Sequence, residues 1–383
     1  GMGRYMTVLG AVSVPRGLYR AVRNGPTVVP LERKLGIVEG FWTPKAAKIA
    51  ALAVTDLTPA RAEALFHEMR TLPASKSSFD RLPKALGARW EADRQQYEAL
   101  LRETEQVPEG AVTVAISLDG VMVAMNSEER ARRKAESRAR GFRDSGPVGH
   151  REATVGALSF YDAKGTRLAT RRVARMPESR QVTVRQQLLA ELEHIRQMRP
   201  DLRVVAVADG SRGLWGFLGG LGAQYEVVDF FHAAEHLKDA LDKLMGATSR
   251  ETHQRFEELR HALLNEPDGV DQVIAALDDL EKARKKRTRV ARSARYFRRH
   301  RERMYYAALQ AKSLPIGSGV IEGTCKSIVS DRLRRAGMRW SGHGGQAILT
   351  LRALTQSDRF DRGWGLLKTS YCDDVAEAAR KAA

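Results

Sequence analysis

Cysteine is almost absent from this sequence, since only Cys325 and Cys372 occur among 383 residues. Two cysteines can form neither a disulfide framework nor a four-ligand zinc site, so we expect a reducing, cytoplasmic setting. No apolar run approaches the roughly 20 residues that a membrane-spanning helix needs. The opening stretch GMGRYMTVLG also lacks the apolar core of a secretory signal. These absences disfavour secreted disulfide-rich proteins and integral membrane proteins, and we expect no membrane partner.

Negative charge is also scarce relative to positive charge. The chain carries 64 lysines and arginines against 46 aspartates and glutamates, a formal net charge of +18 at pH 7. Such an excess favours a polyanionic partner, usually nucleic acid and sometimes an acidic membrane surface. Hydrophobic residues make up 43% of the chain, which is enough for a sizeable core. The length allows two or three domains.

The first hundred residues change from irregular to helical sequence near Thr43. Short strands are expected at YMTVLGAVSV, and Thr-Pro pairs at 43–44 and 58–59 mark the starts of two helices. A third, shorter helix is expected in SKSSFDRLPKAL and a fourth in RWEADRQQYEALLRETEQ. The third helix is rich in serine, lysine and arginine. Successive short helices with such a third element are compatible with a helix-turn-helix DNA-binding unit, and equally with a helical packing domain.

Strands and helices alternate from residue 108 to about residue 235. A buried strand is expected at AVTVAISLDGVMVAM, and EATVGALSFYDAKGTRLATRRV predicts a hairpin that turns at residues 162–165. Next come a helix at TVRQQLLAELEHIRQM, a strand ending at Asp209, a helix near 211–218, a strand at YEVVDFF and a helix from near His232. This order predicts an α/β fold with a mixed sheet flanked by helices.

The following segment, residues 236–312, is expected to be helical and highly charged. Twelve lysines and arginines lie between residues 281 and 303, and three of the arginines recur at helical spacing: Arg292, Arg295 and Arg299. Tyr296 and Phe297 lie among them. Basic side chains with interleaved aromatics suit a nucleic-acid backbone and an unstacked base. The alternative is a solvated helix face.

Three carboxylates occupy positions where the backbone is expected to hold them rigidly. Asp119 lies within the first strand of the α/β region, and Asp209 ends a later strand. Glu322 falls in the first turn of a helix that follows GSG at 317–319 and that Ser318 could cap. Mg²⁺ prefers oxygen ligands, and two such ions bridged by acids can support phosphoryl transfer. The alternative for Asp209 is a cap on the next helix.

The helix of Glu322 also carries basic residues. A spacing of four residues is expected to place four polar side chains on one face: Glu322, Lys326, Ser330 and Arg334. An acid followed by bases on one face could hold a metal ion and then a phosphate. The alternative is a face that simply lies in solvent.

Three stretches of the chain resemble a known family. They are VVAVADGSRGLWGFL, YEVVDFFHAAEHL and LPIGSGVIEGTCKSIVSDRLRRAGMRWSGHGGQAILTLRAL. They resemble DDE transposases of insertion-sequence elements of the Kra type, which are related to the Mutator-like and Lre-type transposases. The resemblance covers nearly the whole chain and is strongest from Val204 to Trp364. It implies an RNase H-like mixed sheet with flanking helices, interrupted by an all-α insertion domain and preceded by a mainly helical N-terminal region.

The resemblance also implies roles for individual residues. The catalytic acids, and the ligands of two Mg²⁺ or Mn²⁺ ions, would be Asp119, Asp209 and Glu322. Related families carry an Asp-x-x-His signature, here Asp229 and His232, and we expect these two and Lys326 to be auxiliary. His232 alone would equally suit a helix cap or a satisfied core histidine. The residues expected to bind DNA are Arg292, Arg295, Arg299 and Arg334.

One departure from the family concerns zinc. Members often carry a Tyr-x-Cys-x-x-Cys-Gly pattern near the N-terminus, but YRAVRNG has Ala21 and Asn24 where the cysteines would stand. No zinc is therefore expected. The abrupt start of the chain would fit a truncated product.

The resulting hypothesis has five segments. They are an N-terminal helical DNA-binding region (1–107), two parts of the catalytic core (108–235 and 314–366), the basic helical insertion between them (236–313) and a tail (367–383). The protein would cut DNA at element ends and transfer the strand to target DNA, as a homodimer or higher oligomer associated with the bacterial nucleoid. The alternatives are a catalytically silent DNA-binding descendant and an RNase H-like nuclease without strand transfer.

Overall fold

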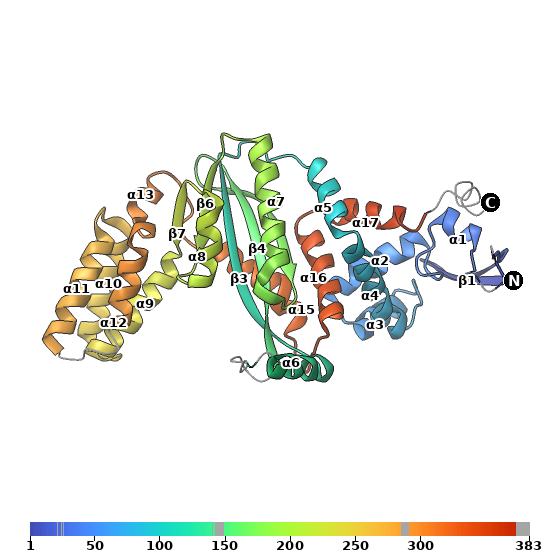
Figure 1. The fold of residues 1–383 in the computed structure, drawn as a ribbon, viewed down its shortest axis with the longest axis horizontal. Helices are drawn as coiled ribbons and strands as arrows, with labels where there is room; N and C mark the ends of the chain where they lie inside the picture. The colour runs from blue at the N-terminus through green and yellow to red at the C-terminus, as the bar shows by residue number, and fades with distance from the viewer. Residues whose placement is uncertain are drawn as a thin grey trace.

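The computed structural model describes residues 1–20, 22–23, 25, 27–139, 141, 149–284 and 291–372, with the backbone alone at 212, 283–284 and 291–293. The molecule is elongated (Figure 1). A sheet lies at its centre, helices between residues 230 and 310 lie at one end, and a mainly helical region with the N-terminus lies at the other. Among the described helices, none is long and apolar enough to cross a membrane.

The central sheet has five strands. They are β3 (Thr113–Ala124), β4 (His150–Tyr161), β5 (Arg167–Arg175), β6 (Arg203–Ala208) and β7 (Tyr225–Val228), in the spatial order β5-β4-β3-β6-β7. β4 runs antiparallel to both β3 and β5, whereas β6 runs parallel to both β3 and β7. The mixed sheet and the β4–β5 hairpin predicted from the sequence are confirmed.

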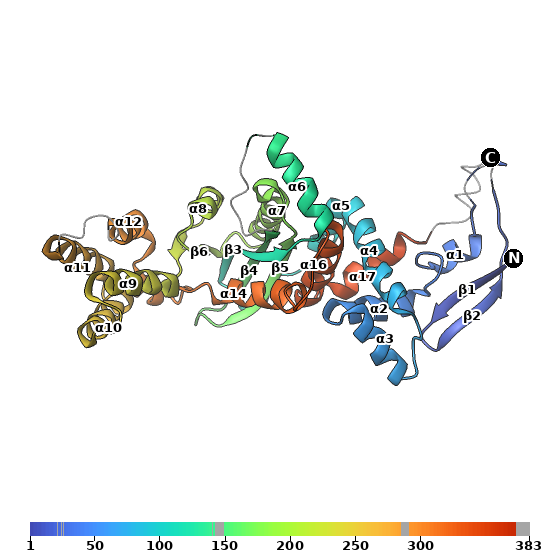
Figure 2. The ribbon, with the colours of Figure 1, turned by 90° about the horizontal axis from the view of Figure 1, so that it is seen from below.

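Helices cover both faces of this sheet because alternate strand residues point to opposite sides. Leu158 of β4 belongs to the hydrophobic cluster that contains Leu188 of α7 (Val182–Met198). Val155 and Ala157, which are out of phase with Leu158, pack with a segment on the other face. That segment consists of α14 (Gly319–Thr324), a π-helical turn (Cys325–Ser330) and α15 (Asp331–Leu333). Figure 2 shows α7 and α14 on opposite sides of the strands.

The N-terminal region has its own core. Its elements are β1 (Met2–Thr7), β2 (Gly10–Pro15), α1 (Pro30–Leu35), α2 (Pro44–Asp56), α3 (Pro59–Glu68), α4 (Lys76–Ala92) and α5 (Arg94–Glu103). Two helices from the end of the chain, α16 (Gly342–Gln356) and α17 (Phe360–Thr369), complete it. α16 packs against both α4 and β5. It therefore joins the N-terminal region to the sheet.

The sequence predicts a third helix shorter than its neighbours, and this prediction is wrong. α4 spans 17 residues and continues through Pro83. Proline removes one backbone hydrogen bond inside a helix, but Leu82, Leu86 and Trp90 are buried along the same helix, and this burial offsets the loss. A Cβ atom on Gly87 would overlap Ala347 of α16. This side of α4 is therefore a packing surface.

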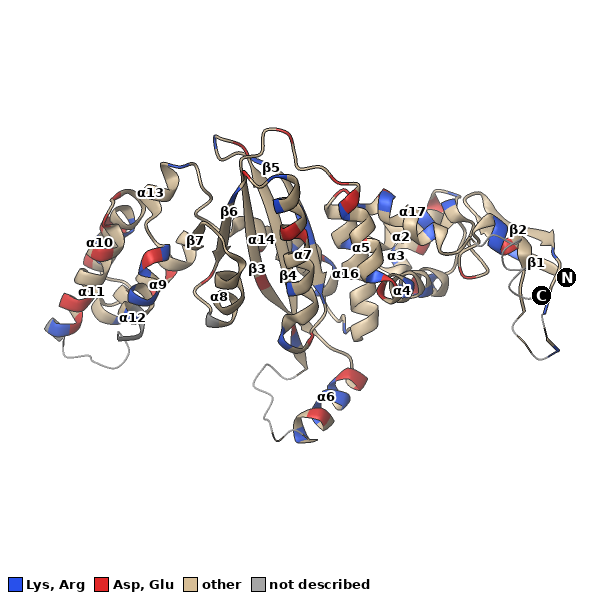
Figure 3. Ribbon diagram, turned by 45° about the horizontal axis from the view of Figure 1, so that its top comes forward, with Lys and Arg blue, Asp and Glu red and all other residues tan. Residues whose placement is uncertain are grey.

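One helix that the sequence does not predict is α6 (Ser127–Ala139), between β3 and β4. None of its residues is buried, so it has no apolar periodicity that could reveal it. Arg132 pairs with Glu129 at 2.5 Å and with Glu136 at 2.6 Å, at the spacing that stabilises an exposed helix. Figure 3 shows both charge signs along α6, which projects away from the sheet.

The segment between the two parts of the α/β region is helical, as predicted. It contains α9 (Phe230–Met245), α10 (Arg250–Asn265), α11 (Gly269–Arg284), α12 (Ala291–His300) and α13 (Tyr306–Gln310). Leu241, Leu263 and Leu277 are buried between these helices. Phe297 of α12 is also completely buried. The expectation that Phe297 meets an unstacked base is therefore wrong, because this ring forms part of the core.

Candidate functional site

Three aspartates share one level of the sheet: Asp119, Asp209 and Asp229. Ile116 of β3 pairs with Ala206 of β6, and Ala208 pairs with Val228 of β7. Continuing the first pair by three residues and the second by one residue reaches the three aspartates. Adjacent strands lie about 4.8 Å apart. The three residues therefore form a row across neighbouring strands.

Asp209 follows the last residue of β6 and precedes α8 (Arg212–Leu218). Its Oδ1 accepts the backbone N–H of Ser211 at 2.9 Å, and its carbonyl accepts the indole N–H of Trp215 at 2.6 Å. Asp209 thus helps to shape the start of α8, although Ser211 is the N-cap residue. Among the described residues, no hydrogen bond reaches Oδ2 of Asp209. This oxygen is available to a ligand.

Asp119 lies inside β3, next to two other groups of the site. Its Oδ1 accepts the Gly120 N–H at 2.7 Å, and its Oδ2 lies 3.7 Å from Sγ of Cys325. Burial raises the pKa of the Asp119 carboxyl, and the nearby charge of Asp209 raises it further, whereas the Gly120 N–H and Cys325 oppose the rise. The two carboxylates are therefore close enough to repel each other.

Glu322 is linked to the end of β7 through Ser318. The buried Asp229 accepts the backbone N–H of Ser318 at Oδ2, and the Ser318 hydroxyl donates to Oε1 of Glu322 at 2.7 Å. The Phe230 N–H donates to the Ile316 carbonyl at 3.0 Å. Ser318 is the N-cap residue of α14, but its hydroxyl bonds this carboxylate rather than a backbone N–H. These bonds bring Glu322 to the aspartate row.

Three of these residues form a group that could hold a metal ion. One ligand atom each from Asp229, His232 and Glu322 lies within 4.8 Å of the other two. Asp229 is the N-cap residue of α9 and accepts the His232 N–H at 2.6 Å. The alternative in which His232 is the helix cap is wrong, because Asp229 has that role. The half-buried His232 side chain belongs to the group instead.

We refer to four residues together as the acid cluster: Asp119, Asp209, Asp229 and Glu322. In the part of the chain that the structure describes, none of them forms an ion pair with a lysine or arginine. Converging carboxylates without counter-ions repel one another, and a divalent cation removes that repulsion. The donor set consists of carboxylate oxygens with one imidazole. Its chemistry suits Mg²⁺ or Mn²⁺.

Lys326 and Arg334 do not follow Glu322 at regular α-helical spacing. The backbone is π-helical from Cys325 to Ser330, and an i→i+5 turn rotates the residues after it relative to those before it. Lys326 and Arg334 are both exposed. The single straight face predicted from four-residue spacing is therefore interrupted, although its basic members do lie on the surface.

A basic hollow of about 330 Å³ lies beyond the end of α15. Four of its lining residues are basic or titratable: His150, Arg334, Arg335 and Arg339. Arg334 and Arg339 are exposed. The hollow follows α14 and α15 in the chain, the segment that carries Glu322. The hollow therefore offers positive charge at the end of the segment that carries Glu322.

The basic run of the inserted helices is partly neutralised. Its ion pairs include Arg298 with Asp278, Arg301 with Asp271 at 2.5 Å and Arg303 with Glu226 at 2.6 Å. Arg295 and Arg299 are exposed on α12, whereas the side chain of Arg292 lies outside the described residues. Figure 3 shows acidic residues interspersed with basic ones over α9, α10 and α11. This end of the molecule therefore carries charges of both signs.

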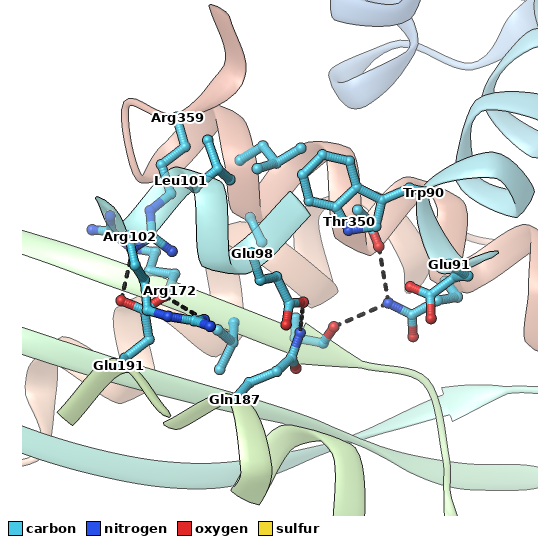
Figure 4. Close-up of a pocket in the computed structure, with 15 residues that line it drawn as sticks. Trp90, Glu91, Glu98, Leu101, Arg102, Arg172, Gln187, Glu191, Thr350 and Arg359 are labelled. Atoms are coloured by element: carbon cyan, nitrogen blue, oxygen red, sulfur yellow. Dashed lines mark hydrogen bonds and ion pairs between the residues drawn. The ribbon is translucent and has the colours of Figure 1, made fainter. Parts of the chain in front are cut away.

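Another hollow, shown in Figure 4, has a different character. It lies among α4, α5, β5, α7 and α16, and the acids in it have partners. Glu98 accepts from the Gln187 amide at 2.5 Å, and Glu191 pairs with Arg359 at 2.8 Å. The acids here have counter-ions or hydrogen-bond donors in the protein itself. We regard this hollow as part of the packing between the N-terminal region and the sheet.

Two features of the site differ from what the sequence predicts. The sequence predicts Ser318 only as a helix cap and the aromatic residue Tyr296 only as part of a basic face. Tyr296 instead lies against Gly210, and its ring centroid is 4.0 Å from that of His236. The spacing of Gly-Ser-Gly before an acid was the available signal for Ser318. No signal in the sequence pairs Tyr296 with Gly210, because 86 residues separate them.

Comparison with known proteins gives little independent guidance. No family model and no curated protein matches the chain. Among solved structures, it is similar to the Drosophila P element transposase strand transfer complex. The identity is 12%, the match covers 88% of this chain and 85% of that chain, and the TM-score is 0.31. This score is too low to establish a common fold, so function is inferred from the site's own residues.

Proposed function

We propose that this protein is a DNA transposase whose RNase H-like core uses Asp119, Asp209 and Glu322 as its catalytic acids. The observation that carries the proposal is the acid cluster itself. Carboxylates from β3, from the ends of β6 and β7 and from α14 come together without a lysine or arginine partner among the described residues. The net charge of +18 supports a polyanionic substrate. The sequence resemblance supplies the class of reaction.

Asp119, Asp209 and Glu322 would hold two Mg²⁺ or Mn²⁺ ions. When bound, such ions stabilise the charge that develops on a phosphate and favour ionisation of the attacking hydroxyl. Asp229 would position Glu322 through Ser318, since both oxygens of Asp229 already accept backbone N–H groups. His232 would contact the DNA strand or complete a ligand set with Glu322. We expect no role for zinc.

The proposed reaction has two phosphoryl-transfer steps. In the first, a water oxygen bonds to phosphorus at the element end and the bond to O3′ breaks. This nicks the strand and leaves a 3′-hydroxyl on one side of the nick and a 5′-phosphate on the other. In the second, that 3′-hydroxyl attacks a phosphorus of target DNA and releases a target 3′-hydroxyl. The protein contributes by positioning the reacting groups and neutralising charge.

The rest of the chain would bind DNA and keep two ends together. We propose that residues 1–107 form a DNA-binding region, that 236–313 is an insertion between core segments 108–235 and 314–366, and that 367–383 is a tail. Arg334, together with Arg335 and Arg339 around the basic hollow, would contact the phosphate backbone. The exposed Arg295 and Arg299, and Arg292, would make further contacts. A homodimer would hold two element ends.

The test is nicking and joining of supercoiled plasmid DNA. We expect nicked product in Mg²⁺ or Mn²⁺, none in EDTA, and joined product when an oligonucleotide with a free 3′-hydroxyl is supplied. Nicking without joining would identify a nuclease of the same kind. Binding without either reaction would identify a silent DNA-binding protein. Both outcomes contradict the proposed strand transfer.

His232→Ala separates the two possible ligand sets. If Asp119, Asp209 and Glu322 hold the ions and His232 only positions DNA, the change should reduce single-turnover cleavage by about 10²-fold. Affinity for Mn²⁺ should then stay the same. A parallel loss of Mn²⁺ binding would assign His232 to the metal instead.

A further inference from the structure

The inserted helices touch the turn that carries Asp209. Gly210 directly follows this acid, and a Cβ atom on Gly210 would overlap the ring of Tyr296, lying 2.9 Å from both its Cζ and its hydroxyl oxygen. Tyr296 comes from α12, which lies beyond β7 and three intervening helices in the chain. The ring therefore fills the space above the Asp209–Gly210 turn. Only glycine leaves room for it there.

Other rings fix the position of Tyr296. The ring of His236, from α9, is nearly parallel to it, with centroids 4.0 Å apart and an interplanar angle of 29°. Phe297 meets it edge-on at 5.5 Å, and His300 lies 5.1 Å away. Burial lowers the pKa of His236, which keeps its ring neutral in this stack. Tyr296 is thus wedged between the inserted helices and the turn.

The hydroxyl of Tyr296 does not explain this arrangement. Its oxygen is buried, and no described residue hydrogen-bonds to it. An unsatisfied buried hydroxyl disfavours the folded state. The nearby charges of Asp209 and Asp229, together with burial, raise the pKa of Tyr296, so the group stays neutral. The ring, rather than the hydroxyl, is the part that makes favourable contacts.

We propose that Tyr296 is a positioning residue for Asp209, whose turn it fixes by packing on Gly210. The inference rests on the proposed function only in taking Asp209 as a metal ligand. It gives the inserted helices a second role besides any contact with DNA. Their packing sets the position of a carboxylate in the core.

The experiment compares Tyr296→Ala with Tyr296→Phe in the full-length chain, with Mn²⁺ affinity measured by calorimetry as the main readout. Tyr296→Ala should weaken Mn²⁺ binding about 10-fold and slow plasmid cleavage by about 10²-fold. Effects of that order are expected when a metal ligand moves by about 1 Å. Tyr296→Phe keeps the ring. Both quantities should remain within about 2-fold of the wild type, with thermal stability unchanged or higher.

Leu263→Ala is the control for general loosening of the inserted helices. Leu263 is completely buried in α10, so its truncation should lower the thermal midpoint without changing Mn²⁺ affinity of the folded protein. An equal loss of affinity in this control would overturn the proposal. A loss in Tyr296→Phe as large as in Tyr296→Ala would also overturn it, because the hydroxyl would then be the active part.

A double-mutant comparison at Gly210 and Tyr296 gives a sharper test of their contact. Gly210→Ala should weaken Mn²⁺ binding about 10-fold in the wild-type chain, because the new Cβ displaces the Tyr296 ring. In the Tyr296→Ala chain the same change should add no more than about 2-fold, since the space is empty. Additive losses would contradict direct contact between the two sites. A wild type that binds Mn²⁺ but never cuts DNA would contradict the proposed function, while these binding differences would still decide the role of Tyr296.

Discussion

Two groups of acids in this molecule are treated in opposite ways. The acid cluster, which lies within β3 and at the ends of β6 and β7, has no lysine or arginine partner among the described residues. By contrast, Glu105 and Glu191, buried between α5, α7 and α17, are surrounded by arginines. Their ion pairs include Arg359 with Glu105 at 2.5 Å and with Glu191 at 2.8 Å, Arg171 with Glu105 at 3.1 Å and Arg362 with Glu105 at 2.6 Å.

The difference separates a structural role from a chemical one. Acids that pair with arginines are neutralised when the chain folds. Removal of one arginine leaves a buried carboxylate without its counter-ion. Acids that have no lysine or arginine partner are neutralised when a cation arrives. The first group holds α17 against α5 and α7. The second remains available for a ligand, and its members weaken the fold in the absence of one.

The largest effect is expected for Asp209→Asn. It keeps the size of the side chain and removes one of the repelling charges, so the free energy of unfolding should stay the same or rise slightly. Metal-dependent cleavage should fall by about 10³- to 10⁴-fold, because several kcal/mol of charge stabilisation disappear. Single-turnover cleavage and denaturant unfolding on one preparation check both parts. Retained activity would remove Asp209 from the site.

Arg359→Met should have the opposite profile. It leaves Glu105 and Glu191 buried without their shared partner and should lower the free energy of unfolding by about 3–5 kcal/mol. Mn²⁺ affinity of the folded protein should not change. Urea unfolding measures the first quantity and calorimetry the second. The control is Lys368→Met, on the exposed side of α17, the helix that Arg359 precedes. This change should shift the free energy of unfolding by no more than about 0.5 kcal/mol.

Divalent cations should stabilise the protein through the acid cluster alone. At Mn²⁺ concentrations 100 times the dissociation constant, the free energy of unfolding should rise by about 2.7 kcal/mol. Thermal unfolding with Mn²⁺ and with EDTA gives this difference. It should persist in a Glu191→Gln chain and vanish in Asp209→Asn. An equal response in all three proteins would place the bound cation elsewhere.

The smallest effect concerns pH. Burial alone would raise the pKa of Glu105, but the hydrogen bond from Arg359 and the charges of Arg359, Arg171 and Arg362 lower it below its ordinary value of 4.5. The folded state therefore holds this proton less tightly than the unfolded state. The stabilisation is complete above pH about 4.5 and is lost as the pH falls through the folded pKa.

Comparison with Glu105→Gln tests this sign. The wild type should lose stability as the pH falls below about 4.5, and the variant, which is less stable at pH 7, should show a shallower loss over the same range. Urea unfolding at several pH values provides the curves. Parallel curves would mean that Glu105 does not titrate differently in the two states.

The sequence by itself determined most of the local structure. Apolar, β-branched runs and the turn at 162–165 predicted the strands β3 to β7, and Thr-Pro pairs predicted the starts of α2 and α3, because these patterns depend on neighbours within a few residues. The positions of Asp119 and Asp209 on or after strands also follow from these patterns. The charged helix α6 could not be predicted, since a helix that buries nothing has no apolar period.

Only the tertiary structure decided which residues meet. Strand register places Asp229 level with Asp209. Ser318 bonds both Asp229 and Glu322, and so it links two acids that lie 93 residues apart in the sequence. The packing of α12 likewise places Tyr296 on Gly210. These contacts depend on how helices and strands far apart in sequence pack together, and no local pattern encodes that packing. The sequence therefore determined the acids that could act, and the fold determined which of them lack a counter-ion.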